Sequence, residues 1–187
     1  MLKRTPNADD LIAPIQQGEV VAYPTEGVFG LGCDANDRAA CERIIELKRR
    51  RPEQGMIVLI AEWSQLSGWM QPLDSQQQQR LAQRANDFVT WLVPVNENAP
   101  KVLCGQHQTL AVRRPVWSPL WTFCRALGRP LVSTSANPHG QSAALNAAEV
   151  AGYFGQNSAL HSVWDYPCGG YGRPSSIFSL SDGRQWR

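Results

Sequence analysis

The sequence contains 187 residues, 43% of them hydrophobic and 18% charged, so it can bury a core and is not of the disordered class. Its formal net charge of +2 speaks against a polybasic nucleic-acid binder. The longest apolar run extends only from Met56 to Ala61, whereas a membrane helix needs about 20 residues. We therefore expect a soluble protein with one domain over 1–187 and no contact with a membrane.

The cysteines are odd in number, widely spaced and free of any Cys-x-x-Cys pair: Cys33, Cys41, Cys104, Cys124 and Cys168. This pattern is typical of free thiols in a reducing cytoplasm and speaks against a zinc site or a disulfide scaffold. The three histidines are isolated from one another, and no apolar segment of the signal-peptide type follows the N-terminus. We expect a cytoplasmic protein without protein ligands for a metal.

The first elements alternate between helix and strand. A helix is predicted over 9–17, shortened or kinked by Pro14. A short β-rich run over 20–23 follows and ends at Pro24. A glycine-rich turn over 27–32 comes next, so the chain reverses soon after this strand.

A strong amphipathic helix is predicted over 38–51, with Asn36 or Asp37 as its N-cap. Its last turn carries four consecutive cations, which suits the negative end of the helix dipole. Pro52 ends the helix. The continuous apolar run 56–60 is then typical of a strand buried on both faces.

The second half of the chain continues the alternation. Helices are predicted over 75–85, over 118–127 and from Asn146 to Gly155. Strands are predicted over 89–93, 110–112 and 176–180, and another begins at 131–132 and runs into 133–137. Interleaved elements with uneven spacing predict an α/β fold in which helices flank a twisted, open mixed sheet rather than a barrel.

The first candidate site segment covers 23–30, where a strand ends and Thr25 and Glu26 follow at its tip. Strand tips are where α/β proteins bind ligands. An ordinary strand and turn, with the glycines serving backbone geometry, is an equally weighted alternative. The order Gly-x-x-Gly-x-Gly matches neither the dinucleotide fingerprint nor a Walker loop.

The second candidate is the cationic helix end, in which Lys48 and Arg50 lie two positions apart. A solvated helix end is the usual interpretation of any single charge of this kind. Four neighbouring cations repel one another, however, so an anionic partner is an open alternative.

The third candidate is Arg113, which closes an apolar strand beside an Arg-Pro step. An arginine in this position can bind a carboxylate or phosphate through two N–H groups, and a structural ion pair is the alternative. The fourth candidate is the segment 133–137, where three hydroxyls and an amide follow two strand residues. These groups can bind phosphate oxygens, or they can form an ordinary loop. No Gly-x-Ser-x-Gly elbow marks any of these serines as a nucleophile.

Taken in order, the four segments and the tail 173–177 resemble the YrdC/TsaC family, the threonylcarbamoyl-AMP synthases in their short, single-domain bacterial form. The matching residues are Tyr23-Pro24-Thr25-Glu26, Lys48-x-Arg50, Thr109-x-Ala111-Val112-Arg113, Ser133-Thr134-Ser135-Ala136-Asn137 and Arg173-Pro174-Ser175-Ser176-Ile177. The resemblance implies a twisted open sheet around a large, basic concave cavity. It also implies synthesis of L-threonylcarbamoyladenylate and pyrophosphate from L-threonine, bicarbonate or CO2, and ATP accompanied by Mg2+.

The resemblance further implies two groups of site residues. Those expected around the threonine are Thr25, Thr109, Arg113 and Ser175. Those expected around the nucleotide are Lys48, Arg50, Ser133, Ser135 and Asn137. The cations that offset the repulsion between two anionic reactants, and so are expected to support catalysis, are Lys48, Arg50 and Arg113. Partner proteins would pass the threonylcarbamoyl group to tRNA.

Two positions depart from the family pattern. Gln54 stands where a second Lys or Asn often follows the Lys-x-Arg motif, and 86–88 replaces a Pro-Gly-Pro run. Two other functions stay open. A non-catalytic module that binds tRNA or double-stranded RNA would use the same basic cavity, and a relative that transfers a carbamoyl group would keep the fold but change the substrate.

Overall fold

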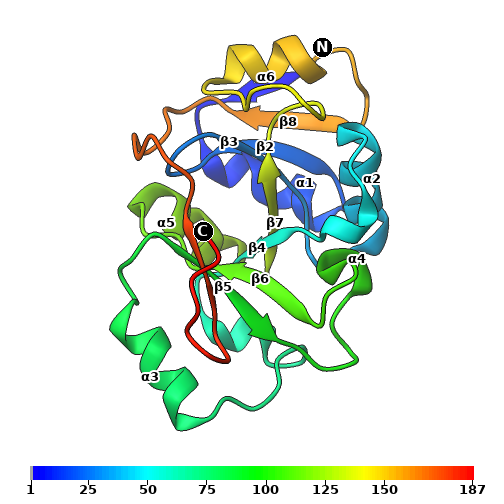
Figure 1. The fold of residues 1–187 in the computed structure, drawn as a ribbon. Coiled ribbons are helices and arrows are strands. Elements are labelled where there is room, and N and C mark those ends of the chain that lie inside the picture. Colours follow the sequence, from blue (N-terminus) through cyan, green and yellow to red (C-terminus); the bar gives the residue numbers. More distant parts are fainter. Residues whose placement is uncertain (1) are drawn as a thin grey trace.

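A single open sheet organises the chain. The computed structural model describes residues 2–187, and within them nine strands follow the order β1-β8-β2-β3-β7-β4-β6-β5-β9 (Figure 1). The strands are β1 (Lys3–Thr5), β2 (Val20–Pro24), β3 (Phe29–Gly32), β4 (Ile57–Leu59), β5 (Val89–Pro94), β6 (Thr109–Arg113), β7 (Leu131–Ser135), β8 (Leu160–Trp164) and β9 (Ser176–Ser179). The sheet contains parallel pairs such as β4–β6 and antiparallel pairs such as β5–β6. The predicted open mixed sheet is confirmed.

Helices and short 3-10 turns connect these strands. The helices are α1 (Ile12–Gln16), α2 (Arg38–Lys48), α3 (Ser75–Gln83), α4 (Lys101–Cys104), α5 (Ser118–Leu127) and α6 (Ala147–Phe154). The 3-10 turns are η1 (Ala8–Leu11), η2 (Pro52–Gln54) and η3 (Trp63–Leu66). No described helix between residues 2 and 187 has the length and apolar character needed to cross a membrane.

Strand β7 joins the two halves of the sheet. Its first residues, 131–133, pair antiparallel with β4, while Thr134 and Ser135 pair antiparallel with β3. The strand therefore changes partner along its length, and its polar end lies where the two halves diverge. This change places the hydroxyl-rich segment at the centre of the molecule.

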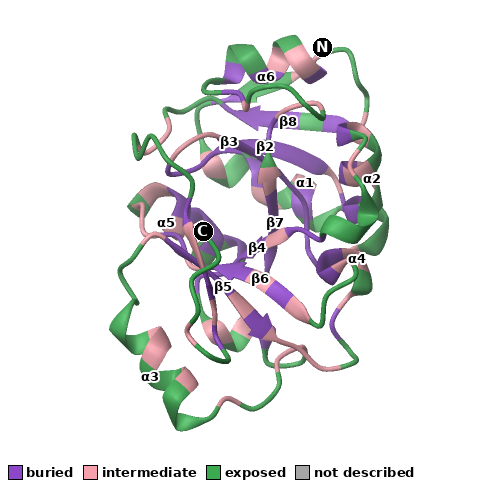
Figure 2. Cartoon of the chain, in the orientation of Figure 1, coloured by how far each residue is buried: buried purple, intermediate pink, exposed green. Residues whose placement is uncertain are grey.

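Helices cover both faces of the sheet, and each face has its own core. Along β2, Val20 and Ala22 pack into one core while Val21 and Tyr23 pack into the other. The first core lies under α2 and α6, and the second lies under α1 and α5. Figure 2 shows the buried strands between helices whose outer faces are exposed. One sheet runs through both halves of the described chain, and one domain over 1–187 stays a prediction.

The structure corrects several predicted boundaries. Helix α2 ends at Lys48 rather than at residue 51, because Arg49 adopts a left-handed conformation with φ 50°. The predicted first helix divides into η1 and α1, whereas α5 covers 118–127 as predicted and has Trp117 as its N-cap. The Asp37 carboxylate accepts a hydrogen bond from the Ala40 N–H, which confirms that N-cap. The predicted glycine-rich turn over 27–32 is wrong for residues 29–32, which form strand β3. The strands β1 and β8, helix α4 and the turns η2 and η3 were not predicted.

Candidate active site

A cavity of about 690 Å³ opens at the centre of the sheet, beside the end of β7. Its described lining contains no acidic residue and contains four arginines: Arg50, Arg113, Arg173 and Arg187. The hydroxyl groups in the lining belong to Thr25, Ser133, Thr134, Ser135 and Ser175. The cavity is therefore basic and rich in hydrogen-bond donors, which suits anionic ligands.

Lys48 lies behind the cavity wall rather than in it. The residue is only 4% exposed, and its Nζ donates to the backbone oxygens of Ser135 and Asn137, the latter at 2.8 Å, and to the Asn137 Oδ1 at 3.1 Å. Burial and the nearby charge of Arg50 lower the pKa of Lys48 to about 8. Lys48 thus ties the end of α2 to the end of β7.

Arg50 reaches the cavity because the chain turns sharply at Arg49. Its Nε and Nη2 both donate to the Gly55 oxygen, at 3.1 and 2.9 Å, which fixes the plane of the guanidinium group. Burial lowers the pKa of Arg50 from its ordinary value. Gly55 has φ 59°, and a Cβ there would lie 2.6 Å from the Leu103 oxygen, so the position requires glycine.

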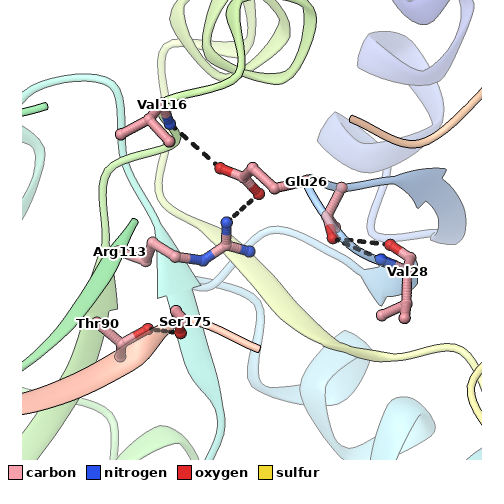
Figure 3. A network of polar contacts seen from close by, with 7 residues as sticks. Glu26, Val28, Thr90, Arg113, Val116 and Ser175 are labelled. Atoms are coloured by element: carbon pink, nitrogen blue, oxygen red, sulfur yellow. Dashed lines mark hydrogen bonds and ion pairs between the residues drawn. The ribbon is translucent and has the colours of Figure 1, made fainter. Parts of the chain in front are cut away.

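Arg113 forms an ion pair, one of the two alternatives that the sequence left open, and it also lines the cavity. It lines the cavity, and its Nη1 forms a buried ion pair with the Oε2 of Glu26, which is fully buried. The other carboxylate oxygen of Glu26 accepts a hydrogen bond from the Val116 N–H at 3.1 Å (Figure 3). The guanidinium also lies 5.2 Å from the centre of the Phe88 ring. Arg113 is therefore held by Glu26, which does not line the cavity, and lies beside Phe88, which does.

Thr25 and Ser175 line the cavity with different local roles. The Thr25 hydroxyl donates to the Val28 oxygen at 2.7 Å, so it closes the turn between β2 and β3. The Ser175 hydroxyl lies 2.8 Å from the Thr90 hydroxyl, which is buried behind it (Figure 3). The Ser175 side chain is thus braced by a residue that does not itself reach the cavity.

Six of the nine predicted site residues line the same cavity: Thr25, Arg50, Arg113, Ser133, Ser135 and Ser175. Lys48 and Asn137 do not line the cavity and are hydrogen-bonded to each other. Thr109 does not lie with the others, which corrects the expectation for that residue. It begins β6, at the end of the strand opposite Arg113, and lines a second hollow of about 850 Å³.

Arg173, Arg187 and Phe88 were not assigned roles from the sequence, yet all three line the cavity. Arg173 belongs to the tail segment 173–177 that resembles the family, so the sequence offered a reason to consider it. No sequence motif includes Arg187. Of the two departures from the family pattern, Gln54 is exposed and lies outside the cavity lining. Phe88, in contrast, belongs to the altered 86–88 segment and forms part of the wall.

The described residues do not form a protein-held metal site. Between residues 2 and 187, no group of three or more His, Cys, Asp and Glu side chains is arranged to hold an ion. Mg2+ prefers carboxylate and phosphate oxygens, and the lining of the cavity offers no carboxylate. The chain's own residues therefore do not fit a resident Mg2+.

An open mixed sheet flanked by helices, with an arginine-rich, hydroxyl-lined cavity at its centre, places the protein in the α/β class. The sequence profile of the Sua5/YciO/YrdC family, described as "Telomere recombination", matches residues 13–187. The chain belongs to this family.

Relatives with similar sequences share one name. A protein of Chromohalobacter salexigens named threonylcarbamoyl-AMP synthase is 43% identical over 178 residues, which cover 95% of each chain. One from Pseudoalteromonas translucida with the same name is 37% identical and covers 94% of each chain.

Solved structures agree with the fold. The crystal structure of P. abyssi Sua5 complexed with L-threonine matches with a TM-score of 0.86 and 26% identity. That match covers 99% of this chain and 56% of the Sua5 chain, so this chain spans little more than half of Sua5. The E. coli YciO structure matches with a TM-score of 0.75 at 22% identity and supports the fold alone.

Proposed function

We propose that the protein is a threonylcarbamoyl-AMP synthase that converts L-threonine, bicarbonate or CO2, and ATP into L-threonylcarbamoyladenylate and pyrophosphate. One observation carries this proposal: the cavity gathers six of the nine predicted site residues, together with Arg173 and Arg187. The shared name of the bacterial relatives and the L-threonine bound to P. abyssi Sua5 support it. The names of these relatives describe an enzyme and do not favour a purely RNA-binding module.

The reaction consists of two bond-forming steps. The threonine amine attacks CO2, a C–N bond forms, and the amine loses a proton to give a carbamate. A carbamate oxygen then attacks the α-phosphorus of ATP, and the P–O bond to pyrophosphate breaks. Two anions must approach each other in the second step, so positive charge and fixed orientation are the main requirements.

The arginines meet these requirements unequally. The charge of Arg113 is partly offset by Glu26, so it can orient a carboxylate without dominating the field. Arg50, Arg173 and Arg187 line the cavity without an acidic partner among the described residues. We assign the threonine to the side of Thr25, Arg113 and Ser175. We assign the nucleotide phosphates to the side of Arg50, Ser133 and Ser135, with Lys48 and Asn137 bracing that wall.

The remaining expectations form part of the proposal. Mg2+ would enter as a companion of the ATP phosphates, where it neutralises their charge. The adenylate is a reactive acyl donor, so partner proteins that transfer the threonylcarbamoyl group to tRNA in the cytoplasm are expected to consume it.

Pyrophosphate release tests the proposal directly. We expect release from ATP only when L-threonine and bicarbonate are both present, together with a product of the mass of L-threonylcarbamoyladenylate. Release independent of threonine, or none in the complete mixture, would contradict the proposal. Replacing threonine and bicarbonate by carbamoyl phosphate tests the carbamoyl-transfer alternative. Salt-sensitive binding to double-stranded RNA without adenylate formation would favour the RNA-binding alternative.

A further inference from the structure

Thr90 lies directly behind the wall of the cavity, between two residues of the site. It belongs to β5, where it is the antiparallel partner of Arg113 in β6 and the parallel partner of Ile177 in β9. Ser175 immediately precedes β9, so the same pairing brings it beside Thr90. Thr90 has no exposed surface and does not line the cavity.

The hydroxyl groups of Thr90 and Ser175 are 2.8 Å apart, and geometry alone allows either to donate. Burial decides the direction. Among residues 2–187, the Thr90 hydroxyl has no hydrogen-bond partner other than Ser175. If Ser175 donated, the Thr90 proton would be buried without an acceptor, which costs about 1–3 kcal/mol. Thr90 therefore donates to the Ser175 oxygen.

This direction fixes what Ser175 offers to a ligand. Its oxygen already accepts one hydrogen bond from Thr90, and its own proton stays free to point into the cavity. The Ser175 backbone is held as well, because its carbonyl oxygen accepts from the Arg187 Nε at 3.3 Å. A hydroxyl arranged in this way is a donor, and beside the arginine-rich lining it suits an anionic oxygen.

We propose that Thr90 is a positioning residue, which makes Ser175 a hydrogen-bond donor to the carboxylate of the bound amino acid. The inference rests on the proposed function, because that function supplies L-threonine as the ligand. In this arrangement the Thr90 hydroxyl donates to the Ser175 oxygen, and the Ser175 proton points into the cavity.

Equilibrium binding of L-threonine, measured calorimetrically without ATP or bicarbonate, tests this proposal. Under these conditions the carboxylate is the anionic group of the ligand. Thr90→Val keeps the shape of the side chain but removes the hydroxyl, and we expect it to weaken binding about threefold to tenfold. Thr90→Ser restores the hydroxyl and should bind within about twofold of wild type. In steady state, Thr90→Val should raise KM for threonine and leave kcat and KM for ATP nearly unchanged.

A double-mutant cycle separates positioning from a general loss of structure. In a Ser175→Ala background, Thr90→Val should have no further effect on threonine binding. Thr5→Val is a matched control, because it also removes a buried hydroxyl group. Thr5 lies in the edge strand β1, and its hydroxyl donates a hydrogen bond to the Asp10 carboxylate. It should leave threonine affinity unchanged.

Two results would overturn the inference: wild-type affinity in Thr90→Val, or an equal loss in the presence and absence of the Ser175 hydroxyl. A wild-type protein that binds no threonine would instead overturn the proposed function, and this inference with it. The two failures are therefore distinguishable.

Discussion

Lys48 at the end of α2 and Asn137 just beyond β7 are joined by two hydrogen bonds from a single ammonium group, to the backbone oxygen and to the side-chain Oδ1. The contact spans 89 positions of sequence and fixes the wall that carries Ser133 and Ser135. The cationic motif thus supports the site structurally as well as through its charge.

Burial of Lys48 predicts a pH dependence of stability. Its pKa is lowered from 10.5 to about 8 in the folded state, so the unfolded chain binds the proton more tightly. Below about pH 8 the buried charge of Lys48 lowers the free energy of unfolding by its full amount. This loss becomes smaller as the pH rises towards 10.5. Relative to Lys48→Met, we expect the free energy of unfolding of wild type to rise by about 1–2 kcal/mol between pH 7.5 and 9.5. Urea titrations of both proteins measure this difference, and a difference that stayed flat or fell would refute it.

The buried pair of Glu26 and Arg113 predicts a large asymmetry between buried and exposed ion pairs. Glu26→Gln leaves the Arg113 charge buried without its partner, which should cost about 3–5 kcal/mol of unfolding free energy. Arg4→Gln breaks the exposed pair with Asp165 and serves as the control, with an expected cost below about 1 kcal/mol. Chemical denaturation checks both values. Similar losses of unfolding free energy in the two variants would show that burial does not increase the contribution of the ion pair to stability.

Arg49 predicts a stabilising substitution. It is the one described non-glycine residue with positive φ, and its left-handed conformation ends α2. Glycine adopts this conformation without steric cost, so Arg49→Gly should raise the unfolding free energy by about 0.5–1 kcal/mol. Arg51→Gly, at a position with φ −71°, should lower it instead. Thermal unfolding of the two variants compares the signs, and destabilisation by Arg49→Gly would contradict the explanation.

Arg50 and its neighbour Arg51 allow a matched test of charge in the cavity. Arg50 lines the cavity, whereas Arg51 is exposed and does not. Losing a charge-assisted contact to phosphate should lower kcat/KM for ATP about tenfold to a hundredfold in Arg50→Ala. Arg51→Ala should stay near wild type. Equal losses in both variants would mean that only long-range charge matters.

Much of the fold could be predicted because hydrophobic patterning and capping are local signals. The apolar run at β4 and the Asp37 cap of α2 illustrate this. Strand β8 escaped prediction because its exposed His161 and the hydroxyl of Ser162 interrupt the apolar pattern. The left-handed turn at Arg49 lacks the glycine that usually marks such a turn, so the end of α2 was misplaced.

The site was predictable only in part. The motif residues indicated which strand ends meet, but not which side chains reach the cavity and which stand behind it. The pairing of Arg113 with Glu26 joins positions 87 apart, and nothing local to either residue reveals it. Thr109 was misplaced because a strand of five residues separates its two ends by about 13 Å. Two residues of one sequence motif therefore need not line the same cavity, because they can lie at opposite ends of a strand.

A crystal structure of the protein soaked with L-threonine and a non-hydrolysable ATP analogue addresses the arrangement of substrates. We expect the threonine carboxylate within hydrogen-bond distance of Ser175 and Arg113, and the nucleotide phosphates beside Arg50 in the same cavity. The amine should face the α-phosphate. Threonine and nucleotide bound in separate hollows, for example with one beside Thr109, would contradict the single reaction chamber on which the proposed function depends.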